Sequence, residues 1–491
     1  MSAAIATPHV DWLALSPSLA LLGAAGLLLM AAVFTPRRPR RAISATLAAG
    51  GYGAAFALAV VVAARSPHGS AIIHDSIFRD RYAGLAQVLI AGCGFITVPI
   101  SYGERWRDEH VAEYYALLSA AGAGMMFFVQ ASNLMTLFLG LEWFSIALYV
   151  LCAIDIDLIG SLEAGLKYLI VGAVGSATLL FGSALVYGIT GELSFDRIAA
   201  AGHAHDAMLV VGLAMIIVGL AFKSSAAPFH MWTPDAYQGA PTPVTAFMSS
   251  ATKITALVVT YRLLQTAFPA DQHLWRWAIA VIACLSLAWG NIAALVQRNV
   301  KRILAYSSVS HAGFMLIAVA AGNALGVRAL FYYLIPYAAM SLGAFAVVAT
   351  RERELGTPVT LANLAGFGWE RPLLGVSMWV FVLGMLGFPL TGGFIGKFYV
   401  FAAAYDHGWW WLIVAGVIAT MISAYYYLGI VRAMYFRESS ELQLAPAGGS
   451  PNREAVLGVG VVLCIAVTVG SFFAVQPLID VAKTAAQALP L

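Results

Sequence analysis

Five ionisable residues stand inside or at the edges of long apolar runs: Glu142, Lys167, Lys223, Lys253 and Lys397. On insertion scales a charged side chain at mid-bilayer costs about 2.5–3.5 kcal/mol, so each of these must face the protein interior, be paired or be neutral. A buried lysine releases its proton easily, and a nearby carboxylate restores its charge. One carboxylate and several lysines on separate helices therefore predict a proton relay.

Each of these residues also has a structural interpretation. Lys167 follows Glu163 by four residues, which fits an ion pair along one helix or a side chain that extends to the surface. Glu142 fits a structural ion pair. His230 and His311 are candidates to link the lysines, because histidine titrates near neutrality, and each is equally a candidate for a packed, hydrogen-bonded side chain.

Two helical segments are interrupted close to these lysines. In LAFKSSAAPFHMWTPDAYQGAPTPV, Lys223 precedes Pro228 and His230, and in GMLGFPLTGGFIGKFYV, Pro389 precedes Lys397. Proline removes a backbone donor, and such a break at membrane depth is tolerated only where protein or water satisfies the freed groups. Paired breaks at matching positions predict two inverted repeats around a midplane site.

The elements that carry these residues are membrane spans. The chain is 61% hydrophobic and 10% charged, far below the charge content of soluble domains. A span needs about 20 apolar residues. Fourteen runs qualify, near 12–34, 42–64, 82–101, 113–131, 134–154, 165–188, 207–227, 242–266, 273–296, 302–322, 327–349, 372–393, 395–434 and 455–475.

The predicted fold is all-α and polytopic. Residues 1–111 hold three spans, 112–266 a first repeat of spans four to eight, 267–437 a second, inverted repeat, and 438–491 the last span. Fifteen basic residues fall in the loops of one side and eight in those of the other, so the positive-inside rule predicts that both termini are periplasmic.

Several site classes have no support in the sequence. Four cysteines are scattered singly without a CxxC pair, which argues against a zinc or iron–sulfur site. No GxGxxG or Walker motif occurs in a nucleotide-binding context, and no loop is long enough for a soluble catalytic module. We therefore expect no cofactor, metal or nucleic acid on this chain.

The motifs resemble a known family. The segments FKSSAAPFHMWTPDAYQGAPTPVTAF, GLEWFSIALYVLCA, EAGLKYLIVGAVGSATLLFGSALVYG, QRNVKRILAYSSVSHAGFMLIA and GFPLTGGFIGKFYVF are similar to subunit N of bacterial complex I, the proton-pumping NADH–quinone oxidoreductase. The likeness covers roughly residues 100–435. YQGAPTPV resembles subunit N rather than the antiporter-like subunits L or M, and the long lateral helix of subunit L has no counterpart after the last span.

The resemblance implies roles for the charged residues. Glu142 would pair with Lys223, and Lys167 would modulate that pair. Lys253 would carry protons towards the centre, and Lys397 would connect to the far side or the next subunit. The implied activity is that of a subunit of a proton-translocating NADH:quinone oxidoreductase, driven by quinone reduction elsewhere in the complex.

NADH, FMN, iron–sulfur clusters and quinone would then belong to partner subunits, and subunits M, K and J are the expected neighbours in a bacterial inner membrane. Two alternatives remain. One is a cation/proton antiporter subunit or a membrane subunit of a related hydrogenase, which share the fold and the charged residues. The other is a scaffold subunit in which the lysines form structural pairs.

Overall fold

The computed structural model describes residues 10–66, 69–73, 75–104, 110–202, 205–436 and 451–489. These residues form a bundle of helices and one two-stranded hairpin, β1 (Ser70–Ile72) and β2 (Ile77–Arg79). The helices are α1 (Trp12–Phe34), α2 (Arg37–Ala64), α3 (Arg81–Tyr102), α4 (Val111–Phe128), α5 (Leu134–Cys152), α6 (Ile159–Thr190), α7 (Phe195–Ala200), α8 (Ala207–Lys223), α9 (Trp232–Gly239), α10 (Thr242–Ala267), α11 (Gln272–Leu295), α12 (Val300–Ala321), α13 (Ala324–Leu355), α14 (Phe367–Glu370), α15 (Pro372–Leu386), α16 (Gly392–Asp406), α17 (Trp410–Phe436), α18 (Pro451–Phe473) and α19 (Val475–Ala486).

Polar caps set where many of these apolar helices begin. The Asp80 carboxylate accepts a hydrogen bond from the Ala83 amide at 2.7 Å at the start of α3, and the Asn133 side chain does the same for Thr136 at the start of α5. Such caps satisfy backbone amides that a helix start leaves without partners. At the other end, Gly322 closes α12 in a left-handed conformation that glycine adopts without strain.

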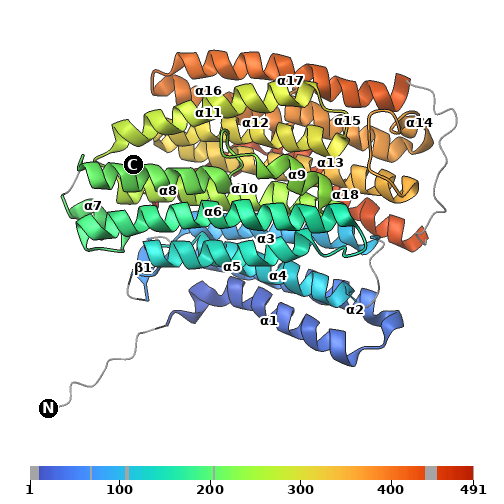
Figure 1. Cartoon of the computed structure of the whole chain (residues 1–491), viewed down its shortest axis with the longest axis horizontal. Coiled ribbons are helices and arrows are strands. Elements are labelled where there is room, and N and C mark those ends of the chain that lie inside the picture. Colours follow the sequence, from blue (N-terminus) through green and yellow to red (C-terminus); the bar gives the residue numbers. More distant parts are fainter. Residues whose placement is uncertain are drawn as a thin grey trace.

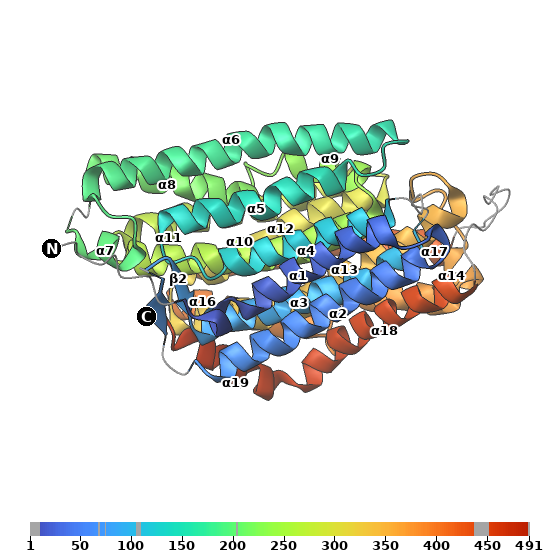
Figure 2. The same cartoon turned by 90° about the horizontal axis from the view of Figure 1, so that it is seen from below.

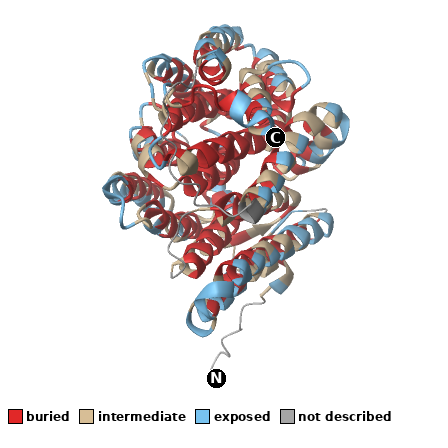
Figure 3. Ribbon diagram, turned by 90° about the vertical axis from the view of Figure 1, so that its right-hand side faces the viewer, coloured by how far each residue is buried: buried red, intermediate tan, exposed pale blue. Residues whose placement is uncertain are grey.

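The long helices lie side by side, and α13 runs through the middle of the bundle (Figures 1 and 2). The membrane-length window of α13 is 94% buried, against 39% for that of α6 at the periphery. Seen end-on, buried residues fill the centre and exposed ones the rim (Figure 3). Because the exposed residues include large apolar side chains such as Phe181 and Met421, this rim is suited to lipid or to neighbouring membrane subunits.

Eleven of the described helices are long and apolar enough to cross a membrane. The apolar α8 and α15 are shorter because each stops at a break, and α10 is not in this set despite its 26 residues. The all-helical membrane fold is thus confirmed, while the count of fourteen spans and the repeat boundaries stay predictions.

Both predicted breaks are present. One separates α8 from α9 between Lys223 and Trp232, and the other separates α15 from α16 between Leu386 and Gly392. The two broken helices run in opposite directions through the bundle, as inverted repeats require (Figure 1).

The predicted division of residues 372–434 was wrong. The span expected at 395–434 is two helices, α16 and α17, and α16 belongs to the broken helix with α15. Gly408 marks the turn between them with a φ of +82°, a conformation that L side chains rarely adopt. The hairpin and the short helices α7, α14 and α19 were not predicted either, because each is too short for a spanning pattern.

The two ends of the bundle differ in charge and in structure. We call the end that carries β1, β2 and α7 the hairpin end, and the end that carries Arg37–Arg41, Arg298–Arg302 and α14 the basic end. The chain starts α1 at the hairpin end, where Asp11 pairs with Arg79 at 2.6 Å, and α19 lies at the same end (Figure 2).

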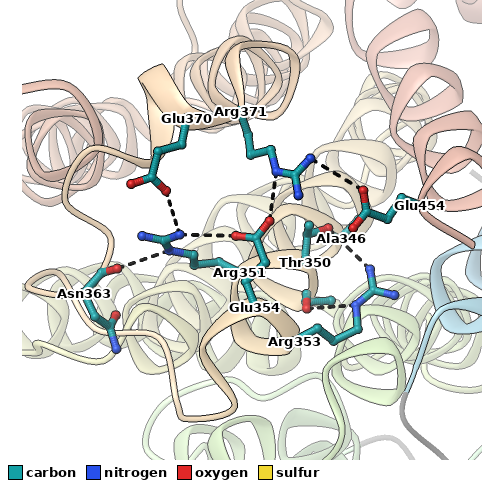
Figure 4. Close-up of polar contacts among 10 residues, drawn as sticks. Ala346, Thr350, Arg351, Arg353, Glu354, Asn363, Glu370, Arg371 and Glu454 are labelled. Carbon is teal, nitrogen blue, oxygen red and sulfur yellow. Dashed lines mark hydrogen bonds and ion pairs between the residues drawn. The ribbon is translucent and has the colours of Figure 1, made fainter. Parts of the chain in front are cut away.

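At the basic end a network of ion pairs joins α13 to α14, α15 and α18 (Figure 4). The fully buried Arg351 contacts Glu354 at 3.2 Å and Glu370 at 2.9 Å. Arg371 then contacts Glu354 at 3.0 Å and Glu454 at 3.5 Å. A network of this kind fixes the ends of four helices relative to one another.

We expect Gly393→Ala to destabilise the second break. A Cβ at Gly393 would lie 2.0 Å from the Gly384 carbonyl oxygen, so the backbones of α15 and α16 would have to separate. Overpacking of this kind costs about 1–3 kcal/mol. Gly429→Ala on α17 is the matched control, because nothing lies within 4 Å of its Cβ position. The measurement is the thermal unfolding midpoint of the purified protein, and equal midpoints for the two variants would contradict the packing argument.

Candidate functional site

Lys223 lies at the last residue of α8, where the helix breaks, and is only 2% exposed. Its ammonium donates to the Ser145 hydroxyl at 2.7 Å and to the Tyr168 hydroxyl at 3.0 Å. It also lies 4.5 Å from the centre of the Phe144 ring, within the range of a cation–π contact. Three helices, α5, α6 and α8, thus meet around one buried ammonium without a carboxylate in direct contact.

Lys253 lies near the middle of α10 and is fully buried. Its ammonium donates to the backbone carbonyl of Ser224, the residue that directly follows Lys223. The first break therefore supplies a backbone carbonyl that accepts a hydrogen bond from Lys253. A charge-assisted hydrogen bond of this kind contributes about 1.5–3 kcal/mol.

A chain of hydroxyl groups continues from Lys253 towards the second repeat. The Ser249 hydroxyl is 2.6 Å from that of Ser341, and the Tyr337 hydroxyl donates to the Ser308 hydroxyl at 3.0 Å and to the Ser249 carbonyl at 3.2 Å. The rings of Tyr337 and His311 lie 5.0 Å apart. These contacts lead from α10 through α13 to His311 on α12.

His311 is buried and contacts two phenol groups. Its Nδ1 lies 2.8 Å from the Tyr333 hydroxyl and its Nε2 lies 3.1 Å from the Tyr427 hydroxyl. Because each ring nitrogen has a partner that both donates and accepts, the imidazole is placed to pass a proton by changing tautomer.

Lys397 lies on α16 and is 6% exposed. Its ammonium donates to the Leu386 carbonyl at 2.9 Å and to the Thr420 hydroxyl at 3.3 Å, and it lies 4.4 Å from the centre of the Phe314 ring. Leu386 is the last residue of α15, so this lysine also binds a carbonyl that a helix break exposes. Neither Lys253 nor Lys397 extends to the surface.

Glu142 on α5 is half-buried, and its Oε1 has no hydrogen-bond partner among the described residues. It interacts electrostatically with Lys223, but between these two residues the structure contains no direct ion pair. The carboxylate therefore lies near the ammonium without contact, at the edge of the bundle.

Lys167 lies apart from the buried lysines. Its side chain is 46% exposed and pairs with Glu163 at 2.6 Å and with Asp235 at 3.2 Å, and Asp235 also contacts Arg302 at 2.6 Å. The ion pair along one helix that the sequence allowed is thus formed. The structure contains no direct contact between Lys167 and Lys223, although the next residue, Tyr168, accepts a hydrogen bond from Lys223.

His230 lies in the first break, 6% exposed, and its Nδ1 accepts no hydrogen bond from the described residues. Its ring faces those of Trp289 and Tyr306 at 6.1 and 6.3 Å between centroids. It is therefore packed among aromatic rings and does not join the hydroxyl chain. Ser250, near Lys253 on α10, donates to carbonyls of its own helix.

The sequence did not indicate the hydroxyl groups that connect the lysines. Tyr168, Ser341, Tyr337, Tyr333 and Tyr427 are all buried, but serine and tyrosine are common in such segments and their spacing carries no distinctive pattern. They reach the lysines and His311 only through the packing of α6 against α8, of α13 against α10 and α12, and of α17 against α12.

Comparisons with known proteins show which family and fold this chain is similar to. Residues 131–423 match the family model described as NADH:quinone oxidoreductase/Mrp antiporter, TM. The chain is 40% identical over 430 residues to NADH-quinone oxidoreductase subunit N of Trichlorobacter lovleyi, covering 86% of this chain and 87% of that one.

Two solved structures have a similar fold. A chain of respiratory complex I from Thermus thermophilus superposes with a TM-score of 0.78 and 31% identity over 94% of this chain and 98% of that chain. A chain of the Mrp complex from Dietzia superposes with a TM-score of 0.83 over 96% and 97% of the two chains, but at 22% identity this shows the fold alone.

Proposed function

Because this chain belongs to the family of NADH-quinone oxidoreductase subunit N, a membrane subunit of respiratory complex I, we propose that it translocates protons along its buried lysines. The observation that carries the proposal is the pair of contacts at the first break. Lys223 and Lys253 are both buried, and the ammonium of Lys253 donates to the carbonyl of Ser224, the residue that follows Lys223 in the chain. Burial disfavours the charged form of a lysine, so either lysine can release a proton to a suitably placed acceptor.

The proposed path continues over hydroxyl groups. From Lys253 a proton passes by the Ser249 and Ser341 hydroxyl groups to Tyr337 and His311, and from there by Tyr333 towards Lys397. Each hydroxyl accepts one proton and releases another, so no group changes its net charge after a transfer. Water between these groups would close the gaps that no direct hydrogen bond spans.

Glu142 is proposed to control the first lysine. When the carboxylate approaches Lys223 it favours the charged ammonium, and when it withdraws, burial favours release of the proton. The unpartnered Oε1 and the position at the rim of the bundle leave the carboxylate free to respond to a neighbouring subunit. For Lys167 we propose an indirect role, in which its pair with Asp235 adjusts the electrostatic potential near the break.

The driving force is proposed to come from other subunits. NADH, FMN, the iron–sulfur clusters and the quinone would be bound there, and antiporter-like subunit M and small subunits such as K and J would adjoin this chain. The membrane would be the bacterial inner membrane, with the hairpin end and both termini in the periplasm.

The test compares variants of Glu142 and Lys223 in the assembled complex. We expect Glu142→Gln and Lys223→Ala each to lower the rate of NADH-driven proton pumping by about 10²-fold or more, because each removes a group that holds or controls the proton. Assembly is followed by copurification with the quinone-reducing subunits. If Glu142→Gln assembles and pumps at the wild-type rate, the carboxylate is structural. Coupled cation transport by the purified chain alone would favour the antiporter alternative.

A further inference from the structure

A cavity opens at the basic end, between the turns that precede α6 and α10 and the end of α13. Its volume is about 420 Å³, and its lining includes the carboxylates of Glu104, Asp155 and Glu352 and the cations of Lys301 and Arg353. Thr242, the first residue of α10, also lines it. An open cavity of this size with charged groups in its lining holds water.

Glu352 lies where the cavity meets the buried interior. The Thr242 hydroxyl donates to its Oε2, and the ammonium of Lys301 lies 3.7 Å from its Oε1. Glu352 is 27% exposed, whereas Thr242 is only 2% exposed. The carboxylate thus has one oxygen on a buried hydroxyl while it remains accessible to water.

Lys301 holds this arrangement in place. Its ammonium is 3% exposed and donates to the Ala240 carbonyl at 2.8 Å, so it is fixed to the turn before α10. The ammonium beside Oε1 holds the carboxylate in position at the cavity. Lys301 is a positioning residue and does not itself lie on the hydroxyl path.

The helix that begins at the cavity carries a stripe of hydroxyl groups that ends at Lys253. Thr242, Thr245, Ser249 and Lys253 follow at spacings of three, four and four residues, which places them on one face of α10. All four are buried. Neighbours at this spacing lie about 5–6 Å apart at their Cβ atoms, a gap that one water molecule bridges.

The same face is largely apolar on the other side of Lys253. There the corresponding positions are Ala256, Leu257, Thr260 and Leu264, of which only Thr260 carries a hydroxyl group. The polar side chains on this face of α10 therefore lie mainly between Lys253 and the basic end. This distribution favours a proton path from the basic end to Lys253.

We propose that protons reach Lys253 from this cavity, with Glu352 as the group that collects them and Thr242 as the first hydroxyl of the path. The inference rests on the proposed function and adds the point of uptake to it. The Glu352 carboxylate takes a proton from cavity water and passes it to the Thr242 hydroxyl. That hydroxyl releases its own proton towards Thr245 and Ser249, and the last transfer protonates the neutral Lys253 amine.

The experiment uses the assembled complex in sealed vesicles with the basic end outside. The variants are Glu352→Gln, Glu352→Asp, Thr242→Val and Thr242→Ser, and Glu192→Gln, an exposed carboxylate at the hairpin end, is the control. We expect Glu352→Gln to slow NADH-driven pumping at least about tenfold at an external pH of 8, because the variant removes the group that collects protons where they are scarce. At an external pH of 6 the deficit shrinks, since water then supplies enough protons.

The conservative variants separate uptake from structure. Glu352→Asp and Thr242→Ser keep the carboxylate and the hydroxyl and should pump close to the wild-type rate, whereas Thr242→Val keeps the shape of threonine and should resemble Glu352→Gln. If the complex with Glu352→Gln fails to assemble, the pumping rate of Thr242→Val tests the uptake route instead. A deficit equal at both pH values would assign Glu352 a structural role and overturn the inference.

A second outcome distinguishes this inference from the proposed function. If Glu352→Gln and Thr242→Val pump like the wild type while Lys253→Ala does not, the proposed function stands and the uptake route lies elsewhere. If Lys253→Ala itself pumps normally, the proposed lysine path is wrong, and the proposed uptake site that depends on it is wrong as well.

Discussion

Lys253→Ala is expected to stop NADH-driven proton pumping, with a loss of at least about 10²-fold, while the complex still assembles. The reason is the position of Lys253 in the structure. Lys253 is the junction where the first break, the hydroxyl chain towards His311 and the stripe on α10 meet. No other described side chain donates to the Ser224 carbonyl, so the variant leaves a gap that hydroxyls alone do not fill.

Lys253→Arg sharpens this test, because arginine keeps a positive charge but does not release a proton in proteins. If Lys253 carries protons, arginine should pump as poorly as alanine; if its charge only stabilises the break, arginine should rescue pumping. The control is Lys483→Ala on the exposed face of α19. Pumping rates are measured with vesicles, and assembly is checked by the yield of the intact complex.

The second large effect concerns stability. Arg262 on α10 forms a buried pair with Asp80, with both carboxylate oxygens at 2.7 Å and the side chains 1% and 3% exposed. We expect Asp80→Ala to cost about 3–5 kcal/mol, because it leaves a buried cation without its partner. Arg262 also contacts the Tyr82 ring at 4.6 Å, which is too weak to compensate.

An exposed pair provides the control. Asp75 and Arg197 meet at 3.0 Å with side chains 38% and 62% exposed, so Asp75→Ala should cost no more than about 1 kcal/mol. Thermal unfolding of the purified protein measures both. A double variant, Asp80→Ala with Arg262→Met, should recover part of the loss, since it removes the unpaired charge; no recovery would mean that packing rather than charge is responsible.

The sequence predicted the features that depend on composition. Apolar runs and the proline and glycine residues near Lys223 and Lys397 were enough to predict a membrane bundle with two broken helices, because hydropathy and backbone geometry are local properties. The division of residues 372–434 was wrong since one continuous apolar run contains both a break and a turn. The periodicity of apolar residues does not distinguish a break within a helix from a turn between two helices.

The site was predictable only in part. Burial of Lys223, Lys253 and Lys397 followed from the cost of a charge in lipid, but Lys167 lies in an ion-pair cluster at the surface. The difference is one of helix face, since α6 lies at the rim and turns Lys167 outward. Hydrogen-bond partners such as Tyr168 came from tertiary packing, which no local pattern records.

The carbonyl groups at the two breaks have a further consequence. Ser224 and Leu386 stand at the carboxyl ends of α8 and α15, where the aligned peptide dipoles of a helix sum to a partial negative charge. Each break thus offers Lys253 or Lys397 a counter-charge made of backbone. A carboxylate in that place would compete for the proton and hold it, whereas an amide oxygen is far too weak a base to take it. The helix ends can therefore stabilise a charged lysine without becoming a trap on the path, and no side-chain substitution removes them.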